Sequence, residues 1–296
     1  MSKQKIETNP TERLMENMPL MLTVLLLVDS LHFVFGRLLG QYLPPTVSAF
    51  YVLAVATVQV GLFMAWRGMI RFSVLRQNLW FFISIGFLVA GATMFSYLSV
   101  TYVDAGTASL LGRSGVVFTL LLGLFWLKER LTRMQWLGTA VALSGAIIIG
   151  FQPGELLRLG SLFVLLSSFM YALHVAIVKR YGGEIEFANF FLYRVAFTTA
   201  FLLLFVIGQR QMVWPTGEVW IFLILTGTVD VVISRVLYYL ALRQMTLSMH
   251  TIILMLSPVI TIGWSLLLFG EAPTLQSFIG GVVIIGGILI VNFARK

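Results

Sequence analysis

Arg113 lies near the middle of an apolar stretch, ASLLGRSGVVFTLLLG, at residues 108–123. An arginine at the centre of a bilayer costs at least about 2.5–3.5 kcal/mol on insertion scales, so a partner must offset this cost. On a helix Arg113 shares a face with Ser109, Val116 and Val117, whose small side chains can line a cavity. Arg113 and Ser109 are therefore candidates for binding a carboxylate, a phosphate or another anionic group. The alternative is that an aspartate or backbone carbonyl groups neutralise the guanidinium.

Asp29 and His32 are three residues apart, which places both side chains on one face of a helix. Histidine can take up and release protons near neutral pH, and a neighbouring carboxylate can take part in this exchange. Both residues are therefore candidates for proton coupling. A hydrogen-bonded pair inside the protein core explains the same spacing equally well.

Asp230 is a third candidate for proton coupling, and Arg235 follows it in the same apolar segment. Five residues turn an α-helix by about 500°, which leaves the two side chains about 140° apart. We therefore expect Asp230 and Arg235 to have different partners. A pair between Asp230 and Arg113 would neutralise Arg113 without any ligand, although a bound anion could displace the carboxylate.

Two further histidines occur at positions where they can bind a small molecule. His174 shares a helix face with Tyr171, and His250 lies on one helical stripe with Ser257. Hydrogen bonds between helices are the alternative role for both. Beside His32 and His174 the only second metal ligand at helical spacing is Asp29, so the sequence predicts no metal site and no cofactor.

Other residues of the apolar segments have either a structural or a functional explanation. Pro258 interrupts the hydrogen-bond ladder of its helix and is a candidate for gating, although prolines are common in membrane helices. Tyr97 and Tyr239 can stack on a ligand or pack against neighbouring helices. Arg194 lies eight residues into its segment, and we expect its side chain to extend toward the membrane interface.

The composition is that of a membrane protein. Of the 296 residues 59% are hydrophobic and only 11% are charged, and the mean hydropathy is +0.95. Apolar runs of about twenty residues occupy nearly the whole chain, which leaves no room for a soluble catalytic domain. The absence of cysteine excludes disulfides, thiolate metal sites and a cysteine nucleophile.

The hydropathy pattern predicts an all-α integral membrane protein with ten transmembrane helices. After a polar cytosolic tail at residues 1–18, the expected spans are 19–39, 46–66, 79–99, 105–127, 134–151, 159–178, 187–208, 218–240, 245–269 and 275–294. If the N-terminus is cytoplasmic, 14 of the 20 Lys and Arg residues lie on the cytoplasmic side and three on the outside. This asymmetry predicts a multi-pass protein of the plasma (cytoplasmic) membrane with both termini in the cytoplasm.

The sequence contains an internal repeat with an offset of 142 residues. This offset aligns Glu129 with Glu271, Gly138 with Gly280 and Gly145 with Gly287. We expect two units, at 19–151 and 159–294, in which the glutamates cap helix N-termini and the glycines allow close helix packing. Five helices are an odd number, so the two units must be inverted relative to each other, which is typical of secondary transporters.

Two segments resemble the ends of the repeats in one known family. They are YVDAGTASLLGRSGVVFTLLLGLFWLKERLTRMQWLGTAVALSGAIII and QMTLSMHTIILMLSPVITIGWSLLLFGEAPTLQSFIGGVVIIGGILI, and each combines a small-residue helix, a glutamate and a glycine-bearing helix. The chain resembles the EamA-like members of the drug/metabolite transporter superfamily over residues 20–294. The resemblance implies a central cavity bordered by the expected helices 19–39, 79–99, 105–127, 159–178, 218–240 and 245–269. One departure is that Gly115 and Val116 align with Ser257 and Pro258, where family members frequently have proline.

The sequence therefore predicts a secondary active exporter of a small polar metabolite, amino-acid-like and either anionic or zwitterionic, that works by alternating access. An exporter of drugs or cationic compounds with the same fold, and a membrane partner protein without transport activity, are the alternatives. The segment GRSG at 112–115 matches the G-x-S-G of intramembrane serine proteases, but four such residues occur readily by chance, and we expect no enzyme. The expected partners are a small-molecule substrate and membrane lipid, with a homodimer as one option and no nucleic acid.

Overall fold

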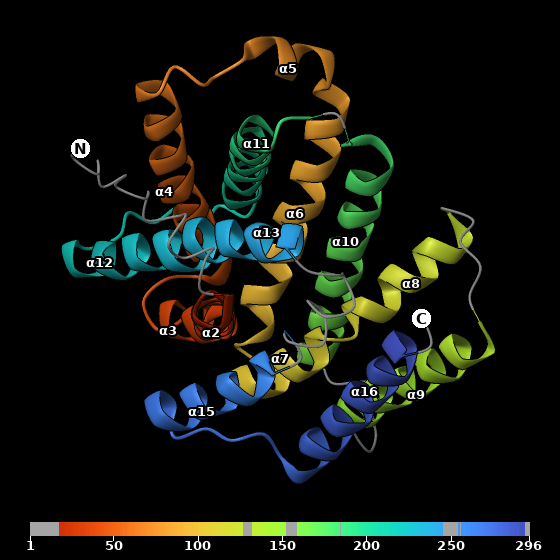
Figure 1. Cartoon of the computed structure of the whole chain (residues 1–296). Helices are drawn as coiled ribbons and strands as arrows, with labels where there is room; N and C mark the ends of the chain where they lie inside the picture. The colour runs from red at the N-terminus through yellow and green to blue at the C-terminus, as the bar shows by residue number, and fades with distance from the viewer. Residues whose placement is uncertain are drawn as a thin grey trace, which may run out of the picture.

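The structure is a computed structural model, which describes residues 18–126, 132–151, 159–183, 185–244, 254 and 256–293. These residues form helices and contain no strand, as Figure 1 shows, so the all-α class is confirmed for them. Seven of their helical segments are long and apolar enough to cross a membrane, and three shorter apolar helices accompany them. The elements are α2 (Met18–Asp29), α3 (His32–Leu39), α4 (Pro45–Trp66), α5 (Phe72–Gln77), α6 (Leu79–Ser99), α7 (Ala105–Gly112), α8 (Gly115–Phe125), α9 (Arg133–Gly150), α10 (Leu159–Tyr181), α11 (Phe187–Gly208), α12 (Gly217–Thr226), η1 (Gly227–Ile233), α13 (Ser234–Gln244), α15 (Ser257–Phe269) and α16 (Leu275–Phe293).

Local sequence signals determine where several helices begin. Pro45 occupies the first turn of α4, where its missing N–H costs no helical hydrogen bond. Asp104 caps α7 by accepting a hydrogen bond from the Thr107 backbone N–H at 2.8 Å. Thr132 and Gln135 form a capping box at the start of α9. In these three helices the start therefore lies within about two residues of the expected one.

Two of the expected helices are broken, which the hydropathy pattern did not reveal. The segment 19–39 divides into α2 and α3 at Ser30 and Leu31, and the segment 105–127 divides into α7 and α8 at Arg113 and Ser114. Glycine and serine pairs of the kind found in GRSG are a common cause of sharp helix kinks. The breaks lie directly beside the charged residues of these segments.

Side chains from the C-terminal half of the chain satisfy backbone groups that the breaks release. Thr261 of α15 donates a hydrogen bond from its hydroxyl to the Ser30 carbonyl at 2.8 Å. Ser168 of α10 donates from its hydroxyl to the Gly112 carbonyl at 3.4 Å. Broken helices are tolerated inside membranes only where neighbours provide such hydrogen bonds, so the C-terminal half of the chain stabilises the irregular backbone of the N-terminal half.

The segment expected at 218–240 also departs from a regular α-helix. Between α12 and α13 the chain forms the π-helix η1, whose widened turns hydrogen-bond each residue to the one five positions away. Asp230 lies inside η1, and Arg235 is the second residue of α13. The separation of 140° that α-helical geometry predicts for this pair therefore does not apply.

The halves of the chain also meet through reciprocal contacts. Helices α9 and α16 lie side by side (Figure 1), and a Cβ atom at Gly138 would lie 2.6 Å from the Gly287 carbonyl oxygen. At the other end of the crossing, a Cβ atom at Gly145 would lie 2.6 Å from the Gly280 carbonyl oxygen. The prediction that these glycines allow close packing is confirmed.

Helices α4 and α11 repeat the offset of 142 residues that the sequence shows. Both contain 22 residues, and their first residues, Pro45 and Phe187, are separated by this offset. The hydroxyls of Thr57 and Thr199, which the same offset aligns, share a hydrogen bond of 2.8 Å. Equivalent positions of the two segments thus contact each other directly.

Candidate functional site: a charged cavity between the helices

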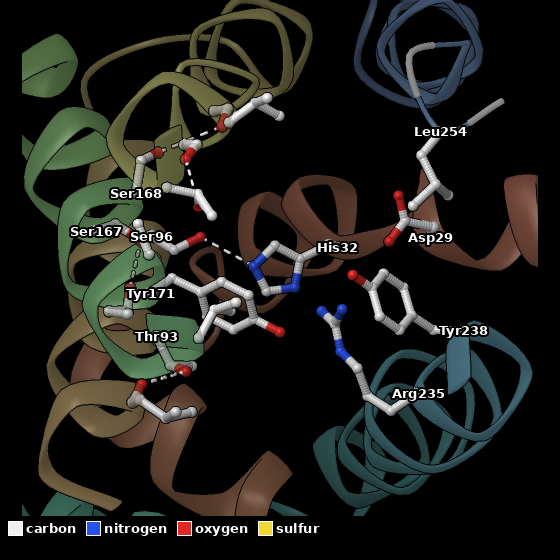
Figure 2. A pocket seen from close by; sticks show the side chains of 18 of the residues that line it. Asp29, His32, Thr93, Ser96, Ser167, Ser168, Tyr171, Arg235, Tyr238 and Leu254 are labelled. Atoms are coloured by element: carbon white, nitrogen blue, oxygen red, sulfur yellow. Dashed lines mark hydrogen bonds between the residues drawn. The ribbon is translucent and has the colours of Figure 1, made fainter. Parts of the chain in front are cut away.

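A cavity of about 450 Å³ lies between the helices, and Figure 2 shows the side chains of its wall. This volume is within the range of small-molecule sites, roughly 300–1,000 Å³. Its wall is formed mainly by α2, α3, α6, α7, α8, α10, α11, η1 and α13. The resemblance implied most of these helices but not α11, which contributes Arg194 and Thr198.

The Arg113 guanidinium is paired with Asp29 across the two helix breaks. Its Nη2 atom donates to Oδ2 of Asp29 at 3.3 Å, and the side chains are 20% and 13% exposed. Arg113 is therefore neutralised by Asp29 and not by Asp230, which corrects the alternative considered from the sequence. The partly exposed pair lies in the cavity wall together with Ser109.

His32 is hydrogen-bonded through both nitrogens of its ring. Nδ1 lies 2.9 Å from Oδ2 of Asp230, and Nε2 lies 3.0 Å from the hydroxyl of Ser96, a contact drawn in Figure 2. The expected direct pair of Asp29 and His32 is not formed, because the break at Ser30 interrupts the helical spacing that would have placed them together. Each of the two residues instead has its own charged partner.

Arg235 projects into the same cavity from the start of α13. Figure 2 shows its guanidinium directed toward His32, with the Tyr238 hydroxyl nearby. Its Cζ atom lies 6.0 Å from the centroid of the Tyr171 ring, at the outer limit of a cation–π contact. The carboxylates of Asp230 and Asp29 interact with it electrostatically, but it makes no ion pair with either of them.

The remaining predicted site residues fall into different environments. Tyr97 lines the cavity and is only 2% exposed, and its hydroxyl has no hydrogen-bond partner among the described residues. His174 is equally buried but is not part of the cavity wall. Neither of its ring nitrogens makes a well-formed hydrogen bond in the described structure, although the Tyr171 backbone lies close to the ring.

Four other predicted residues lie outside the cavity wall, outside the described side chains or in an unexpected environment. Arg194 does not extend to the interface: it is 4% exposed and contributes to the cavity wall. Pro258 lies in the first turn of α15, is buried and does not line the cavity. His250 lies outside the described residues, and for Tyr239 only the backbone is described.

The prediction that Glu271 caps a helix is wrong for the described residues, because its Oε1 atom pairs with Arg37 and its buried Oε2 atom accepts no hydrogen bond from them. Arg37, near the end of α3, also donates from Nη1 to the Val100 carbonyl at 2.9 Å. We refer to Arg37, Val100 and Glu271 as the clasp, since they join α3, the end of α6 and the loop before α16. Glu129, the repeat partner of Glu271, lies outside the described residues.

Sequence reasoning missed several polar residues of the cavity wall. Thr93 and Ser96 are three residues apart on α6 and line the cavity together, a spacing that could have identified them. Arg235 was identified only as an isolated arginine, because the π-helix before it was not foreseen. Within the described part of the chain no group of three or more His, Cys, Asp or Glu side chains could hold a metal ion.

Comparison with known proteins identifies the family. The model of the EamA-like transporter family matches the chain twice, at residues 18–151 and 158–293. The uncharacterized transporter YdfC of Bacillus subtilis (strain 168) is 30% identical over 193 residues, which are 63% of this chain and 62% of that protein. The probable terminal-alkyne amino-acid exporter of Streptantibioticus cattleyicolor is 29% identical over 197 residues, which are 64% of this chain and 65% of the exporter. The chain therefore spans slightly less than two thirds of the length of these two relatives.

A more distant relative and a solved structure are similar over nearly the whole chain. An uncharacterized transporter of Archaeoglobus fulgidus is 24% identical over 286 residues, 92% of this chain and 96% of its own length. One crystal structure superposes with a TM-score of 0.65 and 18% identity over 95% of this chain and 98% of the other, which shows a shared fold. The family model and these relatives are all named for transporters or exporters. With both halves matched by the family model, the chain belongs to the EamA-like transporter family.

Proposed function

We propose that this protein is a secondary active transporter that exports a small amino-acid-like metabolite across the cytoplasmic membrane. The observation that carries this proposal is a cavity of about 450 Å³ between apolar helices, with two ion pairs in its wall. Charged side chains at membrane depth are costly and are therefore typical of substrate and ion pathways. Broken helices beside such residues are typical of transporter binding sites.

The proposed architecture has ten membrane-spanning helices in two inverted five-helix units, at 19–151 and 159–294. The two matches of the family model and the recurring bounds of α4 and α11 support two related units. The contacts of Gly138 with Gly287 and of Gly145 with Gly280 are reciprocal, as a two-fold relation requires. Two such units can rock about a shared site and open it to each side of the membrane in turn.

The charges of the cavity favour an anionic or zwitterionic substrate. Arg113, Arg194 and Arg235 face the two carboxylates of Asp29 and Asp230, so the wall carries an excess of positive charge. One relative is named a probable amino-acid exporter, which supports both the substrate class and the direction. The aromatic rings of Phe33, Tyr97 and Tyr171 in the same wall would favour a cationic compound, which is the second candidate.

Proton coupling is proposed for Asp29, His32 and Asp230. If Nδ1 of His32 donates to Asp230, the neutral ring accepts a hydrogen bond from Ser96 through Nε2, whereas the protonated ring must donate to it. Uptake of one proton therefore changes His32 Nε2 from acceptor to donor in its hydrogen bond with the Ser96 hydroxyl, which joins α3 to α6. This change couples the proton to the contact between two helices of the cavity wall.

The direct test is counterflow into proteoliposomes loaded with a metabolite mixture, with and without a pH gradient, measured by mass spectrometry. Selective exchange of acidic or zwitterionic solutes supports the proposal, whereas exchange of cations alone favours the second candidate. An absence of exchange by folded protein contradicts transport of the compounds in the mixture.

Replacement of His32 by Gln tests the proposed proton coupling. The variant His32→Gln should keep counterflow but lose the stimulation by a pH gradient, because glutamine can hydrogen-bond but cannot take up a proton. The measurement is the ratio of exchange rates with and without the gradient. An unchanged ratio would remove His32 from the coupling mechanism.

A further inference from the structure

We infer that Arg235, and not Arg113, binds the carboxylate of the substrate, and that the substrate is a zwitterion carrying an ammonium group beside that carboxylate. This inference rests on the proposed transport function and specifies which side chain selects the substrate. It follows from the pairing of the charges around the cavity, which the sequence alone did not reveal.

The charged residues of the cavity differ in whether they already form an ion pair with another side chain. Arg113 is paired with Asp29, and Asp230 is paired with His32. Arg235 makes no ion pair with any described residue, and its known contact is with the face of the Tyr171 ring. A carboxylate can bind Arg235 without first breaking an ion pair, whereas binding to Arg113 requires the displacement of Asp29.

Arginine is well suited to this role. Its planar guanidinium can bind both oxygens of a carboxylate through two parallel hydrogen bonds. The Tyr171 ring lies beside the guanidinium and leaves its edge directed toward His32, as Figure 2 shows. Arg235 and His32 both line the cavity, so a carboxylate bound to this edge would lie between α3 and α13.

Arg194 is the other arginine of the wall without an ion pair among the described residues, but its surroundings differ. It is 4% exposed, whereas Arg235 is only partly buried. Among the described residues no carboxylate forms an ion pair with Arg194, whereas Arg235 interacts electrostatically with both Asp230 and Asp29. Unlike Arg194, Arg235 therefore offers a cationic subsite close to two carboxylates, and unlike Arg113 it is not paired with either of them.

The neighbouring carboxylates favour a zwitterion over a simple anion. A substrate carboxylate on Arg235 lies within the field of Asp29 and Asp230, which repels a second negative charge and attracts an ammonium group. In addition, Oδ1 of Asp230 and the Tyr97 hydroxyl are buried without hydrogen-bond partners in the described structure. Buried polar atoms are normally satisfied, so these two point to a polar group that binds here.

The experiment compares free amino acids with derivatives that lack one charge. Proteoliposomes are loaded with a mixture of common amino acids, the corresponding amides, which lack the carboxylate, and the N-acetyl derivatives, which lack the ammonium group. For the unmodified protein we expect exchange of free amino acids to exceed exchange of either derivative by about tenfold or more, the effect of losing one charge-assisted interaction.

Variants of Arg235 and Arg113 show which of the two arginines binds the substrate carboxylate. Arg235→Gln should bring the ratio of acid to amide exchange close to one, and Arg235→Lys should lower it partly, because lysine keeps the charge but loses the planar fork. Arg113→Gln should slow exchange but keep the ratio. Arg76→Gln, on the exposed face of α5, is the matched control and should change neither.

The inference is overturned if Arg235→Gln or Arg235→Lys keeps the ratio of the unmodified protein, or if only Arg113→Gln abolishes it. Equal exchange of N-acetyl derivatives and free amino acids by the unmodified protein would refute the zwitterionic substrate. If the unmodified protein exchanges no amino acid at all, the substrate class in the proposed function is wrong. Because the ratio is measured within one sample, it does not depend on the amount of folded protein.

Discussion

At the scale of single residues, the partners of the charged side chains determine what the cavity can bind. The sequence identified Asp29, His32, Arg113 and Asp230 as charged or titratable residues inside apolar segments, and all four line the cavity. It did not identify their pairing, because pairing depends on how different helices meet. Arg113 pairs with Asp29, and His32 pairs with Asp230.

The pair of Asp29 and Arg113 provides the first stability prediction. Asp29→Asn leaves Arg113 without its counter-charge and should destabilise the protein by roughly 1–3 kcal/mol. This is less than the roughly 3–5 kcal/mol of a fully buried pair, because the side chains are 13% and 20% exposed. The measurement is thermal unfolding in detergent for Asp29→Asn, Arg113→Gln and the double variant.

The double variant shows whether the two residues act as a pair. It should lose less stability than the sum of the single variants, because it contains no unpaired charge. Strictly additive losses would mean that the two residues do not interact in solution, and Arg113 would then need another partner.

At the scale of helices, the positions of the segments could be predicted, but their interruptions could not. The bounds of α6 and α11 coincide with the predicted spans 79–99 and 187–208, because long apolar runs end at polar residues. The break at Arg113 and Ser114 occupies only two residues within an apolar run, so a hydropathy window averages over it. Averaged hydropathy does not reveal the π-helix η1 either, so the orientation of Arg235 relative to Asp230 could not be predicted.

The crossing of α9 and α16 provides a prediction with an internal control. A Cβ atom at Gly287 would lie 2.6 Å from the Gly138 carbonyl oxygen, whereas a Cβ atom at Gly286 has no neighbour within 4 Å. We expect Gly287→Ala to lower the thermal stability in detergent by about 1–3 kcal/mol, because the backbones must move apart. Gly286→Ala should leave it unchanged or slightly raised, because alanine favours the helix. Equal stability of the two variants would show that the helices do not cross at these glycines.

At the scale of the whole molecule, the cavity reaches from Tyr97, close to the clasp, to the opposite ends of the helices. The cavity wall includes Gly123, Lys179 and Val291, which are near the ends of α8, α10 and α16. The clasp of Arg37, Val100 and Glu271 joins the ends of α3 and α6 to the loop before α16. With both termini in the cytoplasm, as proposed, the cavity would open inward and the clasp would close the outer side.

Alternating access then requires the clasp to open once in every transport cycle. The chain has no native cysteine, so Arg37→Cys and Glu271→Cys can be introduced together and joined by a bis-methanethiosulfonate, which forms a reducible disulfide with each cysteine. We expect the cross-link to reduce counterflow by at least about tenfold and a reductant to restore it, because the joined residues cannot separate. Each single variant treated with the same reagent is the control and should keep its activity. Full counterflow in the cross-linked protein would mean that the outer side opens elsewhere, and the clasp would then serve only to hold α3 against α6.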